Sequence, residues 1–251
     1  MEPAGLAVGV FAIAGLFNNA VNCFEYVQLG QNFEEDFTTC ILKLDDAKLR
    51  LSRWGQAVGL NGDLRNTKEL NQIFSSEEIN KNVQKRLRHI LKLFSDAEGI
   101  SHKFQIKNES NRNALQPYDP QEDLIPEIRS LRAKLRDLSV KRENVTALKP
   151  RAKWALYEGK HFRQLIEDIT SIISSLVDLF PSIDSAQRRL CDEEAVELVT
   201  PETRQILRDI AAEQDKLLED AMAKMAKQQV RKLYTPIRHF AKDIILASHG
   251  Q

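Results

Sequence analysis

The sequence contains few of the residues from which disulfide, metal and catalytic sites are built. It has 3 cysteines among 251 residues, and Cys23, Cys40 and Cys191 show no CxxC spacing. An odd number of cysteines without paired spacing argues against a disulfide-built secreted domain and favours a reducing cytosol. The histidines are scattered, with no HExxH motif and no tight Cys or His pairs of the kind that bind zinc. We therefore predict that the protein binds no metal.

Motifs that bind phosphate or present a nucleophile are also missing. The sequence has no GxxxxGK, GxGxxG or GxSxG, which excludes the common nucleotide-binding loops and the nucleophile elbow of α/β-hydrolases. Carboxylate pairs such as Asp45-Asp46 and Glu77-Glu78 fall in helical patterns or caps, where a solvated surface is the more common role. The prediction is a protein that is not an enzyme, with no cofactor and no small-molecule substrate.

An excess of charge of either sign is absent as well. Lysine plus arginine and aspartate plus glutamate both number 36, so the net charge is zero and there is no bulk attraction to nucleic acid or membrane. A hydrophobic fraction of 42% and a charged fraction of 29% are ordinary for a soluble globular domain that buries a core. Since no linker and no repeat of fixed period divides the chain, we predict a single domain over residues 1–251.

Charged side chains are missing altogether from one long stretch near the N-terminus. None occurs between Glu2 and Glu25, and Ala4–Phe17 has no polar side chain either. At about 1.5 Å per helical residue, the stretch covers roughly the 30 Å of a bilayer's hydrocarbon core. Gly5 and Gly9 form a GxxxG pair, a spacing that lets membrane helices approach closely. Residues 1–24 are thus a candidate for a latent membrane helix.

Two other interpretations of this stretch are open. Asn18, Asn19 and Asn22 interrupt the apolar run, and runs of about 10–14 apolar residues are usually buried in protein, so at rest we expect a core helix. Ala12–Ala14 resembles a signal-peptide cleavage site. The preceding residues, however, carry Glu2 and no lysine or arginine, so we expect the segment to be retained.

The rest of the chain shows apolar residues at helical spacing and almost no alternating strand pattern. Tyr26–Leu29 prolongs the first helix toward Gly30, and Ser182–Val199 is less regular. Further helices are predicted over residues 37–58, 75–104, 124–138, 154–180 and 200–234, followed by a short C-terminal piece in residues 236–251. Long helices joined by short loops bury their apolar stripes most simply in an up-and-down bundle. The predicted fold class is therefore all-α, a single-domain multi-helix bundle.

Local signals predict where these helices begin and which faces they expose. Ser75 and Glu78 form a capping-box pattern, and Thr200-Pro201 reads as an N-cap followed by a proline in the first helical position. In the helix over residues 37–58, five charged residues lie off the apolar stripe and are expected on a solvated face: Lys43, Asp45, Lys48, Arg50 and Arg53.

A basic helix covers Arg129–Arg142. Its Arg129, Arg132, Lys134 and Arg136 side chains are candidates for contact with anionic lipid headgroups. Acidic residues interrupt the basic run and no aromatic residue is interleaved. This composition favours a solvated face and argues against nucleic acid as a partner.

Three stretches of the sequence carry a family resemblance. They are GLFNNAVNCFEYVQLGQNF, CILKLDDAKLRLSRWGQAV and, in residues 154–160, WALYEGK. Together they resemble the HeLo domain of the fungal HET-s/HET-S/LopB family of heterokaryon-incompatibility, prion-associated cell-death proteins. The first two stretches match over a long and almost ungapped length, whereas the middle of the chain matches mainly in its helical pattern.

The resemblance implies a helical bundle without catalytic activity, which is also likened to the four-helix killer domain of the necroptosis executor pseudokinase. At rest, in the cytoplasm, the domain holds the N-terminal segment; on triggering, the segment inserts into the plasma membrane and the cell dies. The implied partners are membrane lipid and either another copy of the chain or a HET-s-type protein. The membrane-inserting residues are expected to be Ala4, Gly5, Leu6, Val8, Gly9, Val10, Phe11, Ile13, Gly15, Leu16 and Phe17.

The chain departs from the family pattern at its C-terminal end. HET-s-type proteins carry there an amyloid module rich in asparagine and glycine, whereas this chain ends in a helical pattern and the tail ASHGQ. The activating trigger is therefore left open. So is the alternative that the protein is a soluble helical interaction or regulatory module, or an inactive, inhibitory relative, whose N-terminal helix stays in the core.

Overall fold

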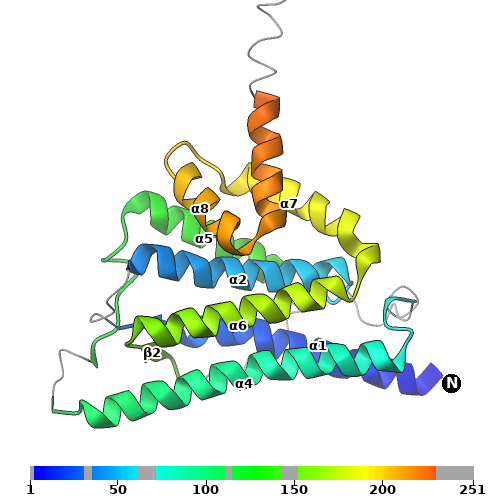
Figure 1. Cartoon of the computed structure of the whole chain (residues 1–251), viewed down its shortest axis with the longest axis horizontal. Helices are drawn as coiled ribbons and strands as arrows, with labels where there is room; N and C mark the ends of the chain where they lie inside the picture. Colours follow the sequence, from blue (N-terminus) through cyan, green and yellow to red (C-terminus); the bar gives the residue numbers. More distant parts are fainter. Residues whose placement is uncertain are drawn as a thin grey trace, which may run out of the picture.

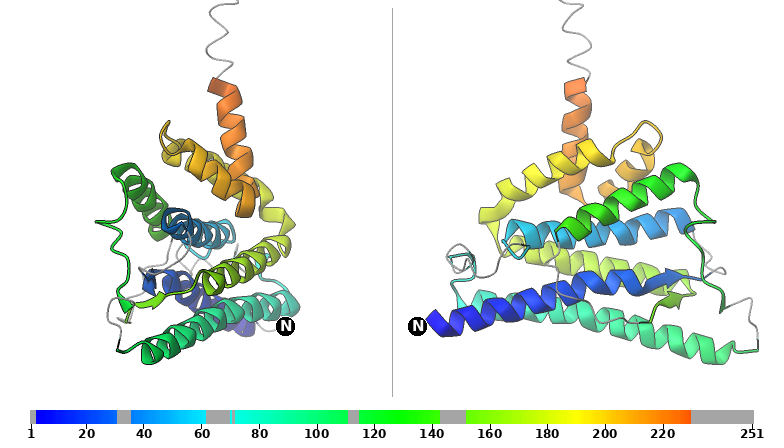
Figure 2. Two further views of the ribbon diagram at one scale, coloured as in Figure 1. Left: turned by 60° about the vertical axis from the view of Figure 1, so that its left-hand side comes forward. Right: turned by 180° about the vertical axis from the view of Figure 1, so that it is seen from behind.

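Two long helices, α1 (Pro3–Cys23) and α4 (Glu77–Lys107), lie side by side along one face of the molecule (Figures 1 and 2). The computed structural model describes residues 3–30, 36–61, 70, 72–110, 115–142 and 152–229, with side chains from residue 9 onward. The two helices run in the same direction, because Gly9 lies beside Asn80 near their starts and Phe24 beside Phe94 further along.

The central element is α2 (Phe37–Ala57), which lies among the other helices (Figure 1) and buries most of its residues. It packs against α5 (Pro126–Lys141), α6 (Gly159–Asp178), α7 (Asp184–Leu198) and α8 (Arg204–Gln214), and it also contacts α1. Residues 216–229 form a further helix. Because α2 packs against several helices, four of its charged side chains are buried along with its apolar ones: Asp45, Asp46, Lys48 and Arg53.

A short pair of parallel strands joins the end of α1 to the start of α6. β1 (Val27–Leu29) pairs with β2 (Trp154–Leu156), and the Gly30 N–H donates to the Leu156 carbonyl at 2.7 Å. The predictions that Tyr26–Leu29 prolongs the first helix and that the helix before Pro181 begins at Trp154 are therefore wrong. Each strand has three residues, which is too short for the alternating pattern by which strands are detected in a sequence.

Three predicted helix boundaries also need correction. Ser182–Val199 is not irregular, because most of it is α7. The N-cap of α8 is Thr203 rather than Thr200, and the helix predicted as far as Tyr234 is interrupted at Asp215. At the start of α4 the capping residue is Ser76, not Ser75, and its hydroxyl accepts a hydrogen bond from the Ile79 N–H at 3.5 Å.

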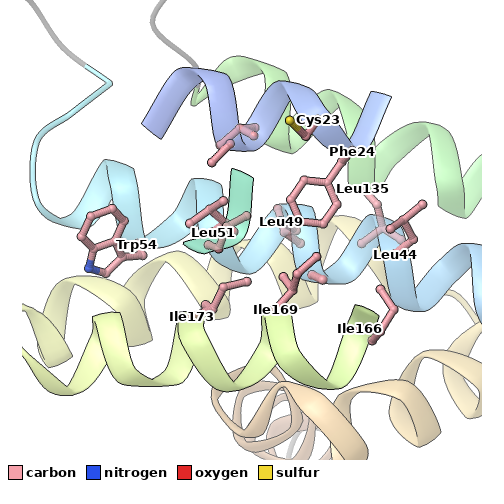
Figure 3. Close-up of a cluster of buried hydrophobic side chains, with 14 of the residues drawn as sticks. Cys23, Phe24, Leu44, Leu49, Leu51, Trp54, Leu135, Ile166, Ile169 and Ile173 are labelled. Carbon is pink, nitrogen blue, oxygen red and sulfur yellow. The ribbon is translucent and has the colours of Figure 1, made fainter. Parts of the chain in front are cut away.

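The fold class is confirmed as an all-α helical bundle, with one continuous hydrophobic core. Apolar side chains from α2, α5 and α6 and from the end of α1 point toward one another in this core (Figure 3). Residues 236–251, in which a short C-terminal piece was predicted, lie outside the described residues.

Candidate functional site

The N-terminal helix α1 has a buried face and an exposed face, and neither face carries a charged side chain. Phe11 is 51% exposed, and Ala12, Gly15 and Asn19 lie on the same outward face. The inward face belongs to the core cluster and is made of Val10, Ile13, Ala14, Phe17, Ala20 and Val21. The expectation that the segment is a core helix at rest is confirmed.

The residues predicted to insert into membrane are thus divided between the two faces. Val10, Ile13 and Phe17 are buried, whereas Phe11 and Gly15 are exposed. Gly9 and Leu16 are half-buried, and the side chains of Ala4, Gly5, Leu6 and Val8 lie outside the described part of the helix. Among the residues that the structure describes, no helix combines the length and the hydropathy of a membrane span.

Phe17 fixes α1 to α2 through a socket that a glycine leaves open. A Cβ atom at Gly55 would lie 2.1 Å from the Phe17 Cζ atom, so any side chain at position 55 would overlap the ring. The Trp54 ring closes the socket in an edge-on arrangement, with 6.1 Å between the ring centroids. Phe17 and Trp54 are both fully buried. This socket joins the N-terminal helix to the central helix α2 through an apolar contact.

Both α1 and α4 carry a buried asparagine side chain, Asn22 and Asn80. A Cβ atom at Gly9 would lie 3.5 Å from the Asn80 Nδ2 atom, which donates to the Phe74 carbonyl at 3.2 Å. Within the described part of the chain, the side-chain oxygens of Asn80 and of Asn22 accept no hydrogen bond. A buried polar atom without a partner costs roughly 1–3 kcal/mol. The docked position of α1 is therefore less favourable than its apolar packing alone would make it.

Just beyond α1, Glu25 is held by two cations from different helices. The Lys48 Nζ of α2 donates to Glu25 Oε1 at 2.7 Å, and the Arg136 guanidinium of α5 contacts Glu25 Oε2. The Lys48 side chain is 1% exposed and that of Glu25 is 29% exposed. We call these three residues the Glu25 clamp. It contradicts the prediction that Lys48 belongs to a solvated face.

The basic helix α5 is directed largely toward the protein. Arg132 Nε donates to Asp45 Oδ2 on α2 at 2.8 Å, and Arg136 belongs to the Glu25 clamp. Lys134 and Arg129 donate to backbone carbonyls of α7 and of the segment that precedes α5. The expectation of a solvated face is therefore wrong for Arg132, whose side chain is 14% exposed. Contact of these cations with lipid headgroups stays a prediction.

A buried ion cluster joins α2 to the C-terminal helices. Arg53 Nη2 contacts Glu194 Oε2 and Asp215 Oδ2, each at 2.6 Å, and Arg142 also donates to Glu194. Burial alone raises the pKa of the Asp215 carboxyl, but the Arg53 guanidinium, Arg50 and a hydrogen bond from the Leu218 N–H together outweigh burial and hold that pKa below its ordinary value. Arg50, also predicted on the solvated face, lies 3.9 Å from the same carboxylate. The cluster therefore remains charged while buried.

Asp46 lies beside this cluster, and its pKa is shifted in the opposite direction to that of Asp215. Its side chain is fully buried, and its Oδ2 atom accepts a hydrogen bond from Gln214 Nε2 at 2.7 Å. Burial, reinforced by the negative charge of Asp215, raises the pKa of Asp46 from 3.8 to about 7. Near neutral pH this group therefore titrates inside the folded protein.

No cluster of potential metal ligands is present in the described ranges of the chain. There, no three His, Cys, Asp or Glu side chains are placed to hold an ion. Cys191 lies beside the ion cluster, but burial raises the pKa of its thiol well above its ordinary value, so the thiol is protonated and a poor nucleophile.

Comparison with known protein families places this helical bundle in one class. Residues 5–212 match the HeLo family model, described as prion-inhibition and propagation, and the chain belongs to that family. It is 35% identical over 246 residues to heterokaryon incompatibility proteins S and s of Podospora anserina, covering 97% of this chain and 79% of each relative.

The solved structure of the HET-s N-terminal domain is similar to this fold. It aligns with a TM-score of 0.76 at 33% identity, and the alignment covers 87% of this chain and 98% of that domain. A double mutant of the same domain aligns with a TM-score of 0.75 at 34% identity, over 84% of this chain and 97% of that one. The resemblance stated from the sequence is confirmed.

Several residues of the site were not found from the sequence. Gly55 offered a signal, since a lone glycine inside a helical pattern suggests a close approach of another group. Glu25 is the first charge after the apolar stretch, but its partners Lys48 and Arg136 are distant in the chain. Nothing in the sequence indicated that Asn80 would be buried, because a polar residue early in a helix is most often exposed.

Proposed function

We propose that the protein is a non-enzymatic, latent membrane-active domain whose helix α1 leaves the bundle and inserts into lipid. The observation that carries this proposal is that α1, without any charged side chain, buries one apolar face in the core while exposing Phe11 on the other. In lipid both faces of such a helix are accommodated. Permeabilised membranes and cell death are the expected outcome, as in fungal heterokaryon incompatibility.

The energetics of α1 favour a balance that a modest trigger can shift. Docked, the helix buries Val10, Ile13 and Phe17; inserted, it buries the same groups in lipid together with Phe11. The two apolar burial terms therefore largely cancel. The equilibrium between docked and inserted α1 is then set by smaller free-energy terms, such as the cost of the unbonded oxygens of Asn22 and Asn80. Self-association through Gly5 and Gly9 would add to the inserted state.

The surroundings of the inserted helix follow from the same proposal. The domain is in the cytoplasm at rest and moves to the plasma membrane on activation. Arg129 and Lys134, which lie on α5, would contact anionic headgroups together with Arg132 and Arg136 once the domain reaches the surface. The partners are then membrane lipid and further copies of the chain or a HET-s-type protein.

A reversible cross-link between α1 and α4 tests the proposal on the whole chain. Gly9→Cys and Asn80→Cys can be joined by a disulfide because the two positions face each other. Dye leakage is measured from vesicles of equal parts phosphatidylcholine and phosphatidylserine, before and after oligomerisation forced by a fused, drug-inducible dimerisation module. We expect the oxidised protein to cause no leakage and dithiothreitol to restore it.

Each single-cysteine variant serves as the matched control, since it carries the substitution without the cross-link. Leakage by the cross-linked protein at the level of these controls would exclude release of α1. That result would favour the second candidate, a helical interaction or regulatory module whose N-terminal helix stays in the core. The complete burial of Ile13 and Phe17 is the observation that speaks for this alternative.

A further inference from the structure

The contacts that hold the N-terminal region change in kind at the end of α1. Up to Cys23 the described side chains that face the bundle are apolar, apart from asparagines. From Glu25 onward the chain is held by ion pairs and by backbone hydrogen bonds. Apolar contacts are non-directional and can be exchanged for lipid, whereas buried ion pairs and strand pairing have no equivalent in hydrocarbon.

The segment from Val27 to Gly30 is fixed on several sides. β1 pairs with β2 in parallel register, with Gln28 beside Ala155. The Gly30 N–H donates to one neighbouring carbonyl and the Leu29 carbonyl accepts from the Tyr118 N–H at 2.8 Å. A Cβ atom at Gly30 would lie 2.3 Å from the Tyr157 ring, which shows how closely this backbone is packed.

The Glu25 clamp fixes the residue next to this segment. Lys48 is buried, and withdrawing Glu25 would remove the carboxylate that accepts its hydrogen bond inside the protein. The 3-10 turn Phe24–Tyr26 leads from α1 into β1, and Glu25 of the clamp lies within it, so Phe24 alone separates the end of α1 from the clamped residue. A short turn between two differently held segments is where a change of backbone angles would be confined.

We infer that the hinge for release of α1 lies at Phe24, between Cys23 and the clamped Glu25, and that β1 and the Glu25 clamp stay in place on the bundle when α1 inserts. This inference rests on the proposed release of α1. The Glu25 clamp is then the fixed point next to the moving helix. The released segment ends at Cys23, and the pairing of β1 with β2 keeps the inserted helix attached to the bundle at the membrane surface.

Two cross-links, placed on either side of the hinge, distinguish release of α1 alone from release that extends through β1. Gln28→Cys with Ala155→Cys joins β1 to β2, and it is compared with the α1–α4 cross-link in the same vesicle leakage assay. We expect the β1–β2 cross-link to leave leakage unchanged, whereas the α1–α4 cross-link abolishes it. If both cross-links abolish leakage, release extends through β1 and the hinge assignment is wrong. If neither does, the release of α1 itself is wrong and the inference fails with it.

Hydrogen exchange on vesicle-bound wild-type protein gives a second answer that needs no cross-link to form. The amides of Gly30 and Tyr118 donate to β2 and β1 carbonyl groups, so they should stay protected after activation, while amide protection within α1 changes. Loss of protection at Gly30 together with α1 would show that β1 leaves its partner strand, and would overturn the inference.

Discussion

Substituting Gly55 on α2 should favour release of α1 from the bundle while the sequence of α1 itself is unchanged. The Cβ atom of Gly55→Ala would lie 2.1 Å from Phe17 Cζ and 2.4 Å from Cε2. Carbon atoms in contact are separated by about 3.5 Å or more, so the ring has to withdraw by roughly 1.5 Å. Trp54 lies against the same ring, and Phe17 is fully buried. The ring therefore cannot turn aside within the socket, and the strain acts on the docking of α1.

The magnitude follows from the energetics of overpacked cores. Extra methyl groups in a close-packed core typically cost about 1–3 kcal/mol. If that cost falls on the docked state alone, the ratio of released to docked α1 rises by about 5- to 150-fold. Alanine also has a higher helix propensity than glycine, by about 0.5–1 kcal/mol, but this term acts equally in both states because α2 stays helical.

Vesicle leakage measured against protein concentration is the assay for this prediction. We expect Gly55→Ala to cause half-maximal leakage at a markedly lower concentration than wild type. Gly99→Ala is the matched control, because a Cβ atom there meets nothing within 4 Å, and it should leave the leakage curve unchanged. The double variant Phe17→Leu with Gly55→Ala should reverse part of the effect. If a folded Gly55→Ala variant leaks like the Gly99→Ala control, docking at this socket does not limit release.

Three further predictions concern the ion cluster, pH and truncation. Arg53→Met leaves two buried carboxylates with less compensation and should lower the free energy of unfolding by about 3–5 kcal/mol in urea titrations, whereas the exposed Arg188→Met should leave it nearly unchanged. Because the pKa of Asp46 is raised from 3.8 to about 7, its contribution to stability is present in full below the unfolded-state pKa and is lost as pH rises through about 7. The Asp46 contribution to wild-type stability should thus fall as pH rises from about 4 to about 7, by at most about 1.4 kcal/mol per pH unit, and level off above pH 7, and a slope in that window unchanged in Asp46→Asn would contradict the assignment. Deleting residues 1–17 should abolish leakage while circular dichroism stays dominated by helix, and leakage at the wild-type level by the folded truncated protein would exclude α1 as the effector.

The fold could be predicted where one face of a helix meets the core and the other meets water. That assumption holds for α4 and α6, whose apolar stripes were identified correctly. It fails for α2, whose charged residues were assigned to solvent although Lys48 is 1% and Arg53 2% exposed. Their partners, Glu25 and Glu194, come from other parts of the chain. No pattern in the local sequence indicates that a helix packs against neighbouring helices on several sides.

The helix α7 was missed for a related reason. Its inward residues include Gln187 and Glu194, which are 2% and 0% exposed. Counting only apolar residues breaks the stripe at both positions and makes the segment look irregular. Glu194 can be buried because Arg53 and Arg142 compensate its charge. Helical periodicity was present in the sequence, but it was hidden by polar residues whose partners are distant.

The candidate site was predicted in its apolar part only. The absence of charge from α1 is a property of the sequence, and it pointed directly to the segment that the bundle docks. The Phe17–Gly55 socket and the Glu25 clamp depend on which helices meet, and the sequence alone does not specify that. Composition therefore identified the helix proposed to move, whereas the residues proposed to control its movement became visible only with the fold.

Depth-dependent quenching of a fluorophore on α1 tests the central proposal most directly. Ala12→Cys lies on the exposed face of the helix, and the native cysteines Cys23, Cys40 and Cys191 are buried, so an environment-sensitive label is directed to position 12. After forced oligomerisation on vesicles, we predict a blue-shifted emission that is quenched by lipids carrying a nitroxide near the bilayer centre. Emission that stays water-like, or is quenched only by headgroup nitroxides while the vesicles leak, would contradict insertion of α1.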